Sequence, residues 1–419
     1  MTEPPQMKIP GVMARRAALK LLDAVMRRGQ PLESALSAAV QNLDRAEDRA
    51  LARAIASETL RRIPDLDGLI DSATKQNLAD DSKARMVLRL ALAQVLILKT
   101  PEHAAVSTAL PLVDGGPRRL VHGVLGALLR RKVELPASPN LPSDVARRWR
   151  AAWGDEALAL ARLQLCGQPP LDLSLKDASR TEEFADRLQG QSLANGHVRI
   201  GSSAHLLELP GFAEGDWWVQ NIAARIPALL LGAGGGRSVL DLCAAPGGKS
   251  MQLAAAGWEV TALDQDRARL VRLEDNLTRT GLSAKVVCAD MMKWTPSVQY
   301  DAILLDAPCT ATGIFARHPD VLHRVRPRDI AALAAQQMHM IARLAPWLKS
   351  EGRLVYATCS MEPEEGEGQL EAAKTAGFSI DPIEHKEVRG DIAPHPEGWM
   401  RILPRDHADG FFTARFKRD

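Results

Sequence analysis

From Ser238 onward, short apolar runs alternate with stretches of helical pattern, and this alternation constrains the fold more than any other feature of the chain. The apolar runs cover residues 238–242, 259–263, 284–288, 300–305 and 353–357. Strands that alternate with helices are typical of a parallel sheet with helices on both faces. The pattern therefore predicts a doubly wound α/β domain. Two later runs, around Ser379 and over 410–416, are expected to extend its sheet as an antiparallel edge.

The first third of the chain has a different pattern. Residues 11–132 carry apolar side chains at helical spacing and contain no Phe, Trp or Tyr, which predicts an all-α bundle with an aliphatic core. Pro136, Pro139 and Pro142 then mark a linker. We therefore expect a helical domain over 1–135, a small α+β domain over 136–210 and the α/β domain over 211–419. The small domain is expected to have two helices, followed by strands near 171–175 and 197–200.

Charge is distributed unevenly between these parts. Residues 1–135 hold 21 Lys and Arg against 15 Asp and Glu, a net charge of +6, whereas the whole chain carries +2. A basic domain on a near-neutral body suits a polyanionic partner. A solvated helical surface explains the same count equally well.

Cysteine content and hydropathy bear on the compartment. The chain has five cysteines, a small and odd number that argues against a disulfide framework and fits a reducing cytosol. No apolar stretch reaches the length of a membrane span, and residues 1–8 contain no apolar signal region. We expect a cytoplasmic, monomeric protein with no membrane partner and no bound metal.

Four reactive side chains follow the ends of predicted strands. Asp306 and Cys309, in Asp-Ala-Pro-Cys, follow the run 300–305, and Cys359, in Ala-Thr-Cys-Ser, follows 353–357. Lys249 closes the loop after 238–242. The carboxyl ends of strands in an α/β sheet share one crevice, so these groups should converge there. The combination indicates catalysis by a cysteine nucleophile beside a bound cofactor.

The electrostatic surroundings of the two thiols can also be predicted. Lys249 and a helix expected to start at Pro363 should lower a thiol pKa and favour the thiolate. We interpret the glutamates after Pro363 as first-turn residues matched to the helix dipole. Cys166 and Cys288, which lack such surroundings, are interpreted as small apolar residues without a catalytic role.

The loop after the first strand of the α/β domain, residues 241–249, is compatible with more than one ligand. A phosphate-binding P-loop requires glycine where Cys243 stands, and a dinucleotide fingerprint requires Gly-x-Gly-x-x-Gly, which is absent. A nucleoside cofactor without phosphates fits better. Asp264, after the second strand, is placed for ribose hydroxyls, although it is equally suited to cap a helix, and Asp290, after the third strand, for the adenine amino group. S-adenosylmethionine is the best match, and an ATPase that uses Gly248-Lys249-Ser250 and Asp306 is the alternative.

A thiolate beside such a cofactor favours pyrimidine methylation. Carbon 5 of a pyrimidine does not attack a methyl sulfonium unaided, but thiolate addition to carbon 6 makes carbon 5 enamine-like. Addition is easier when ring nitrogen 3 is protonated, and Asp306, at a buried strand end, is a candidate for this acid with a raised pKa. The second thiol can assist release of the product. The residues alone leave open which cysteine attacks.

Together these motifs resemble the RNA cytosine-carbon-5 methyltransferases of the Sun/NOL/NOP group. The matching segments follow one another in the order of that group: 241–249, Asp306-Ala-Pro-Cys309 with Thr312-Gly313, Arg317-His-Pro-Asp320, Ala357-Thr-Cys-Ser360 and Asp409-Gly-Phe-Phe412. The helical region resembles the NusB-type RNA-binding domain. The resemblance implies a Rossmann-like class I methyltransferase domain behind a NusB-like bundle, with a cytosine of small-subunit (16S) ribosomal RNA as substrate.

The resemblance also implies individual roles. Cys359 would be the nucleophile and Cys309 would assist release, with Asp306 and Lys249 completing the catalytic group. The implied contacts to S-adenosylmethionine are Cys243, Ala244, Ala245, Pro246, Gly247, Gly248, Lys249, Asp264, Asp290 and Asp306. Asn221, in Gln-Asn where Gln-Asp is expected, is a departure that concerns a supporting helix. A non-catalytic ribosome-assembly scaffold remains the alternative from another class of function.

Overall fold

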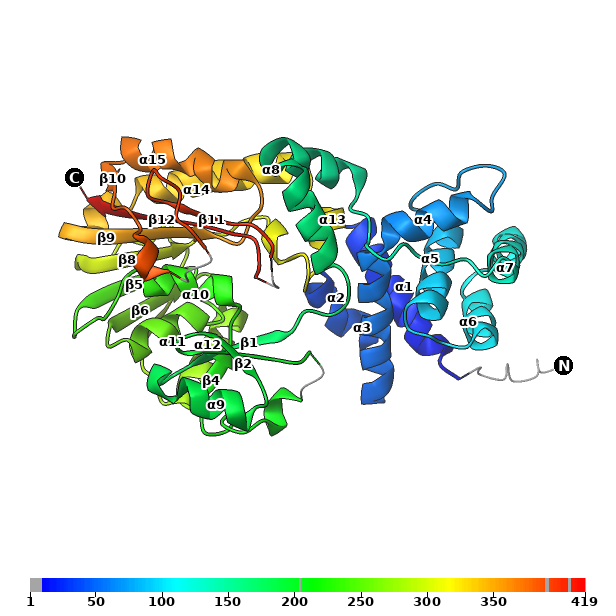
Figure 1. The fold of residues 1–419 in the computed structure, drawn as a ribbon, viewed down its shortest axis with the longest axis horizontal. Coiled ribbons are helices and arrows are strands. Elements are labelled where there is room, and N and C mark those ends of the chain that lie inside the picture. The colour runs from blue at the N-terminus through cyan, green and yellow to red at the C-terminus, as the bar shows by residue number, and fades with distance from the viewer. Residues whose placement is uncertain (1–9, 203–204, 389–391, 406–407, 419) are drawn as a thin grey trace. The chain divides into compact units, whose positions relative to one another are not determined.

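The computed structural model describes residues 10–202, 205–388, 392–405 and 408–418. The chain divides into two compact units, one of residues 1–167 with 317–325 and one of 168–316 with 326–419 (Figure 1). The predicted domain boundaries at 135 and 210 do not coincide with this division, and the three-domain division stays a prediction. The N-terminal residues 1–8, read as lacking a signal region, lie outside the described residues.

The first unit is helical, as predicted. The core cluster formed by residues 12–135 contains only Ala, Val, Leu, Ile and Met side chains, which confirms the expected aliphatic core. α8 breaks at Gly154, so two helical stretches follow the proline linker, as predicted. The described helices are α1 (Val12–Met26), α2 (Leu32–Val40), α3 (Ala46–Arg61), α4 (Ile63–Asp71), α5 (Lys83–Leu96), α6 (Glu102–Ala109), α7 (Gly115–Arg130), α8 (Ser143–Gln164) and α13 (Val321–Arg324).

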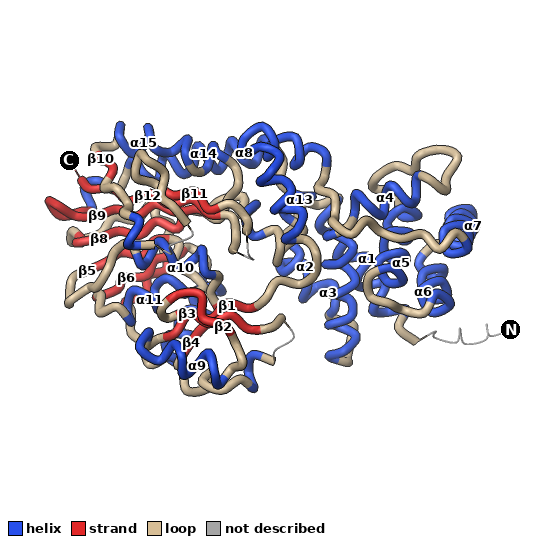
Figure 2. The backbone as a smooth tube through the Cα atoms, viewed as in Figure 1, coloured by secondary structure: helices blue, strands red, loops and turns tan. Residues whose placement is uncertain are grey.

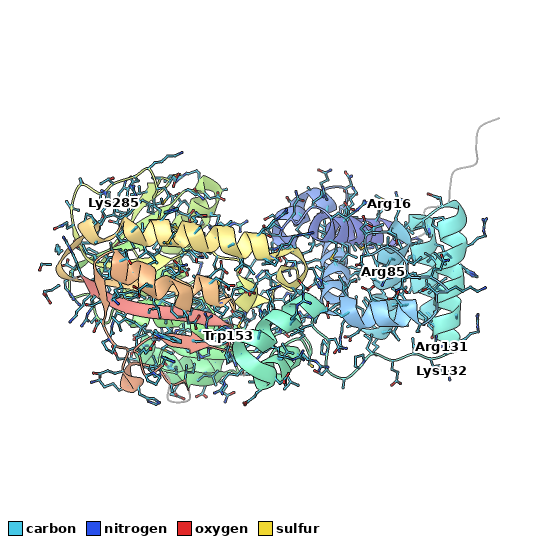
Figure 3. All side chains as sticks on the ribbon, turned by 90° about the horizontal axis from the view of Figure 1, so that it is seen from above. Arg16, Arg85, Arg131, Lys132, Trp153 and Lys285 are labelled. Carbon is cyan, nitrogen blue, oxygen red and sulfur yellow. The ribbon has the colours of Figure 1, made fainter. Side chains whose placement is uncertain are left out.

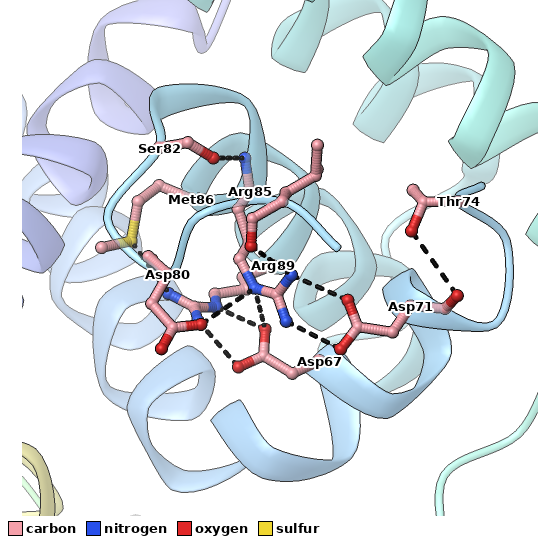
Figure 4. A network of polar contacts seen from close by, with 9 residues as sticks. Asp67, Asp71, Thr74, Asp80, Ser82, Arg85, Met86 and Arg89 are labelled. Atoms are coloured by element: carbon pink, nitrogen blue, oxygen red, sulfur yellow. Dashed lines mark hydrogen bonds and ion pairs between the residues drawn. The ribbon is translucent and has the colours of Figure 1, made fainter. Parts of the chain in front are cut away.

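Buried ion pairs join α4 to α5 in this unit (Figure 4). Arg89, 1% exposed, donates from Nε and Nη2 to the two carboxylate oxygens of Asp67, both at 2.7 Å. Arg85 donates to the same carboxylate at 3.0 Å and to Asp71 at 2.8 and 2.9 Å. Removal of this carboxylate would take away the bidentate partner of the buried Arg89 and leave Arg85 with Asp71.

We expect Asp67→Ala to lower the free energy of unfolding by about 3–5 kcal/mol, the usual cost of breaking a buried ion pair. Urea denaturation of the full chain measures this. Glu33→Ala is the control, since its 2.5 Å pair with Arg53 is solvent-exposed and should contribute less than about 1 kcal/mol. Equal effects of the two substitutions would contradict this account.

The second unit begins with a small antiparallel sheet in the order β2-β3-β1-β4. Its strands are β1 (Leu171–Leu175), β2 (Gln191–Ala194), β3 (His197–Ile200) and β4 (Trp217–Val219), with α9 (Thr181–Arg187) packed against them. The predicted strands 171–175 and 197–200 are therefore confirmed. Asp172 accepts hydrogen bonds from Asn221 Nδ2 at 2.9 Å and Ile222 N at 3.1 Å, which ties this sheet to the start of α10 (Ile222–Leu229).

The large sheet has the order β10-β12-β9-β8-β5-β6-β7, with β11 paired to β12. The strands β5 to β9 are mutually parallel, and β12 pairs antiparallel with β9, as predicted. Figure 2 shows the strands in red. The bounds are β5 (Ser238–Leu242), β6 (Glu259–Asp264), β7 (Lys285–Cys288), β8 (Tyr300–Asp306), β9 (Leu348–Thr358), β10 (Phe378–Ile380), β11 (Met400–Ile402) and β12 (Phe411–Arg418).

Alternate residues of these strands face opposite layers of helices. Val239, Ala302 and Val355 pack with side chains of α10, α11 and α12, while Leu240, Ile303 and Leu354 pack with α14 and α15. The helices are α11 (Gly248–Ala255), α12 (Arg267–Thr280), α14 (Pro327–Ala342) and α15 (Leu370–Thr375). This is the doubly wound sheet that the alternation predicted, and its strand order switches direction between β5 and β8, where such sheets bind ligands.

Candidate active site

The two predicted cysteines meet at the carboxyl edge of the large sheet. β8 and β9 run in parallel with Asp306 opposite Ala357, so the segments that follow them leave the sheet side by side. Cys309 Sγ and Cys359 Sγ are 3.5 Å apart and share a hydrogen bond. Both cysteines are half-buried and free. The convergence predicted from the strand ends is therefore present.

Lys249 and Asp306 form an ion pair at the same edge. Lys249 Nζ, from the first turn of α11, lies 2.6 Å from Asp306 Oδ2 at the end of β8. Burial alone would lower the pKa of Lys249, but the carboxylate of Asp306, with a further contribution from Cys359, raises it instead. The ammonium is thus held charged beside the cysteines, and it is engaged by a carboxylate where an ATPase would need it for phosphate.

The two thiols differ in their electrostatic surroundings. The hydrogen bond with Cys359 raises the pKa of Cys309 well above its ordinary value, and burial adds to this effect. For Cys309 the predicted lowering of the thiol pKa is therefore wrong. A raised pKa favours the neutral thiol at Cys309, which can then donate a hydrogen bond across the pair. The segment after Cys359 also differs from the prediction. Pro363–Glu365 forms a single 3₁₀ turn, whereas a helix was expected to start at Pro363.

The interpretation of Glu365 as a residue matched to the dipole of a helix start is wrong, because its carboxyl group is buried. Its side chain is fully buried and accepts hydrogen bonds from Thr310 N at 2.9 Å, from Ser360 Oγ at 2.5 Å and from Gln337 Nε2 at 3.2 Å. Burial raises the pKa of Glu365. Because Thr310 follows Cys309 and Ser360 follows Cys359, one carboxyl group holds both cysteine segments in place. The only sequence signal for this role is that Glu365 lies in the segment that follows β9 and Cys359.

Gly313 connects Cys359 to a third segment, which contains Gly410. Its amide donates to Cys359 O at 2.9 Å, and its carbonyl accepts from Gly410 N at 2.9 Å. A Cβ at Gly313 would overlap the carbonyl oxygen of Gly410, so only glycine permits this approach. The motifs at 306–313, 357–360 and 409–412 are therefore parts of one site.

A small cavity of about 120 Å³ lies at the carboxyl ends of β5, β6 and β7. Among the predicted cofactor residues, Cys243, Asp264 and Asp290 line it. Asp264 Oδ2 accepts from Ala245 N at 3.2 Å, so this acid also fixes the loop between β5 and α11. The sequence did not indicate the remaining lining, which includes Gln265, Arg269, Ala289, Met291, Met292, Pro308, Gln336 and Met340.

The other predicted cofactor residues do not line this cavity. Ala244, Ala245, Pro246, Gly247 and Gly248 form the turn that leads into α11, while Lys249 and Asp306 face the cysteines. Gly247 has φ 104°, and a Cβ there would lie 2.9 Å from Leu273 Cγ, so the turn requires glycine.

The side chains that line this cavity match the chemical groups of S-adenosylmethionine. Asp264 and Asp290 offer carboxylate acceptors, as ribose hydroxyls and an adenine amino group require, while Met291, Met292 and Met340 offer apolar contacts for a purine. Burial raises the pKa of Cys243, so its thiol remains neutral and adds no charge. These residues fit a nucleoside cofactor.

Asp241, under the cofactor loop, has an unusual carboxyl group. Oδ2 accepts from Ser250 Oγ at 2.5 Å, while Oδ1 has no hydrogen-bond partner among the residues that the structure describes, and burial raises the pKa of Asp241 to about 7. A carboxyl group whose pKa is raised on folding stabilises the fold fully below its unfolded pKa of about 4, and this contribution is lost as pH rises to about 7.

Asp241→Asn removes this titration, because an amide does not ionise. At pH 4 the stabilities of variant and wild type should be similar, and by pH 8 the variant should gain up to about 4 kcal/mol relative to wild type. Thermal unfolding at a series of pH values measures this. A stability difference that does not change between pH 4 and pH 8 would show that the raised pKa is absent.

Two protein-family models match this chain and show its class of protein. The model for 16S rRNA methyltransferase RsmB/F matches residues 228–417, and the NusB family model matches 13–131. The solved structure of PH0851 matches 99% of this chain and 100% of its own with a TM-score of 0.74 at 22% identity. That of NSun6 from Pyrococcus horikoshii matches 66% of this chain and 98% of its own, with a TM-score of 0.58 at 18% identity. The fold is thus a methyltransferase domain with a NusB-like helical domain, as the motifs predicted.

Curated relatives match over nearly their whole length. Ribosomal RNA small subunit methyltransferase B of Xanthomonas campestris is 34% identical, with 96% of this chain and 97% of the relative covered. The protein of the same name from Xylella fastidiosa is also 34% identical, with 98% and 99% covered. The chain belongs to the ribosomal RNA small subunit methyltransferase B family.

Two further features of the described part of the chain concern membrane-spanning helices and metal-binding clusters. Its helices include none with the length and hydropathy of a membrane-spanning segment. Within the same residues, no cluster of three or more His, Cys, Asp or Glu side chains is arranged to hold a metal ion.

Proposed function

We propose that this protein transfers a methyl group from S-adenosylmethionine to carbon 5 of a cytosine in small-subunit ribosomal RNA, through a covalent bond between Cys359 and the base. The observation that carries the proposal is the 3.5 Å contact between the Cys309 and Cys359 sulfurs beside the Lys249–Asp306 pair. The names of the curated relatives support ribosomal RNA as the substrate and methyl transfer as the reaction.

Cys359 performs the first step. Its thiolate adds to carbon 6, a carbon–sulfur bond forms, and the electron pair of the ring double bond moves toward carbon 5. The Lys249–Asp306 pair, whose Nζ and Oδ2 atoms lie 2.6 Å apart, would hydrogen-bond or protonate ring nitrogen 3 as negative charge develops there. Cys243, Asp264 and Asp290 would hold S-adenosylmethionine, which would supply the methyl group and leave as S-adenosylhomocysteine.

Cys309 acts in release. After methylation, the proton on carbon 5 leaves to a base, the ring double bond reforms, and the bond between carbon 6 and the Cys359 sulfur breaks. The leaving sulfur carries negative charge, and the neutral thiol of Cys309 donates a hydrogen bond to it. The raised pKa of Cys309 supports the proposed release role, because a thiol that keeps its proton can donate to the leaving sulfur.

The helical unit supplies a surface for the RNA. Exposed basic residues gather on α7 and just beyond it: Arg118, Arg119, Arg130, Arg131 and Lys132 (Figure 3 labels the last two). Exposed basic residues favour phosphate contacts without sequence preference. With ribosomal RNA as substrate, we propose a cytoplasmic protein that acts as a monomer. An ATPase or a non-catalytic scaffold would use neither cysteine, and no observation favours either.

The direct test is to incubate the purified chain with labelled S-adenosylmethionine and small-subunit RNA from cells that lack the gene, and to map the product by bisulfite sequencing. We expect one cytosine to become resistant to deamination. Label at a base nitrogen or a ribose oxygen, or no label despite cofactor binding, would contradict the proposal.

A further inference from the structure

A second, larger cavity lies elsewhere in the unit that holds the active site. Its volume is about 700 Å³, within the range of pockets that enclose small ligands. The segment after β1, the turn between β2 and β3, α10 and α11 all contribute to its wall. None of the residues that line it lines the cofactor cavity, and neither catalytic cysteine is among them. The site described above therefore does not account for this cavity.

Most of the wall is apolar, and one buried cation faces it. Trp218, Ile222, Ile226 and Leu229 line the cavity together with Arg225, a residue only 5% exposed. The indole of Trp218 is fixed by a hydrogen bond from Nε1 to Gln220 Oε1 at 2.9 Å. The wall therefore contains a fixed aromatic side chain, 3% exposed, and a buried cation.

Arg225 is poorly compensated by the protein. Its Nη2 donates to Asn195 O at 3.0 Å, but Nε has no hydrogen-bond partner among the described residues. Asp172 is near enough to influence it, yet that carboxylate is already bound by Arg199 at 2.6 and 3.0 Å. Burial lowers the pKa of Arg225 to about 10. A buried guanidinium with unused donors is costly unless an anion completes it.

The carboxylates at the same cavity are engaged elsewhere. Glu387 is bound by Arg415 at 2.6 and 3.1 Å, and Asp177 accepts from Ser179 N and Oγ at 2.9 and 2.7 Å. The exposed Lys176 adds a second cation to the lining, although its Nζ donates to Thr280 O at 2.6 Å. The cavity thus matches a ligand with a flat apolar body and an anionic group, which is the chemistry of a nucleotide.

We propose that this cavity binds an unpaired nucleotide of the substrate RNA, with its base against Trp218 and the apolar side chains of α10 and its phosphate at Arg225. The inference rests on the proposed function, because that function supplies an RNA with single-stranded segments. The cavity would then position the RNA through a contact that is separate from the methylated base.

The test measures binding without turnover. The full chain is saturated with S-adenosylhomocysteine, so that the cofactor cavity is blocked, and titrated with cytidine 5′-monophosphate, cytidine or inorganic phosphate by calorimetry. We expect the nucleotide to bind at least about ten-fold more tightly than either fragment, since a charge-assisted contact and an apolar contact are combined. Phosphate that binds as tightly as the nucleotide would show an anion site only and overturn the proposal.

Arg225→Met keeps the apolar volume and removes the charge, so it should weaken nucleotide binding about ten-fold or more. The matched control is Arg279→Met, because Arg279 also has a pKa lowered by burial and donates to backbone carbonyls, but does not line the cavity. Equal loss in both variants, or no loss in Arg225→Met, would overturn the proposal.

A measurement on the unmodified chain covers the case in which Arg225→Met fails to fold. Single-stranded RNA with photoreactive pyrimidines, irradiated in the complex, should crosslink to Trp218 or to α10. Crosslinks confined to other segments would contradict the proposal. If crosslinks form at this cavity but no cytosine is methylated at carbon 5, the proposed reaction fails while the nucleotide site stands.

Discussion

Cys359→Ala and Cys359→Ser are each expected to reduce methyl transfer by a factor on the order of 10⁴ or more, as removal of an enzyme nucleophile usually does. Alanine cannot form the bond to carbon 6. Serine has the right shape, but its hydroxyl remains protonated where a thiol ionises, so addition to the ring does not occur. Binding of S-adenosylmethionine should be unchanged, because Cys359 is not among the residues that line the cofactor cavity.

The measurement is initial-rate transfer of labelled methyl groups to ribosomal RNA, with cofactor affinity determined in parallel. Cys166→Ser is the matched control, since this cysteine is exposed and belongs to the other unit. A Cys359→Ser protein within ten-fold of the wild-type rate would assign the nucleophile elsewhere, in the first place to Cys309.

Glu365→Ala is expected to be the most damaging substitution among residues that do not touch the RNA or the cofactor. The side chain is fully buried and holds the segments after both cysteines through Thr310 and Ser360. Its removal leaves buried donors without an acceptor, which costs about 1–3 kcal/mol for each group. We expect methyl transfer to fall by roughly 10²-fold, since small displacements of reacting groups have effects of that size.

Three readouts distinguish this role from a general loss of stability. In Glu365→Ala, kcat should fall while the affinity for S-adenosylmethionine stays within a few-fold of wild type. Glu365→Gln keeps the size and one acceptor oxygen and should recover part of the rate. Glu364→Ala is the control, because its neighbouring carboxylate is exposed. A Glu365→Ala protein with normal kcat would refute the positioning role.

Much of the fold follows from local patterns that are visible in the sequence. The parallel strands alternate with helices and are buried on both faces, so continuous apolar runs mark them, and the aliphatic helices of residues 11–132 show their spacing equally clearly. The meeting of Lys249, Asp306, Cys309 and Cys359 was predictable because parallel strands end at one edge. These inferences need only periodicity and topology.

Other features depend on contacts between residues far apart in the chain. Glu365 has the sequence surroundings of an exposed helix start, and only the approach of Thr310, 55 residues earlier, makes it a buried anchor. The raised pKa of Cys309 depends on a sulfur that comes from another strand. Arg225 is one of many arginines in the sequence, and its lack of compensation appears only once the small sheet packs beside α10.

The central claim, a transient bond between Cys359 and a cytosine, is tested most directly by trapping that bond. Cys309→Ala removes the hydrogen bond to the leaving sulfur, so the covalent complex with RNA should accumulate and survive denaturing electrophoresis. Digestion and mass spectrometry should place the modified nucleotide on Cys359, and the adduct should be absent from a Cys309→Ala, Cys359→Ala double variant. An adduct attached at any other residue, or full turnover by Cys309→Ala without an adduct, would contradict the mechanism.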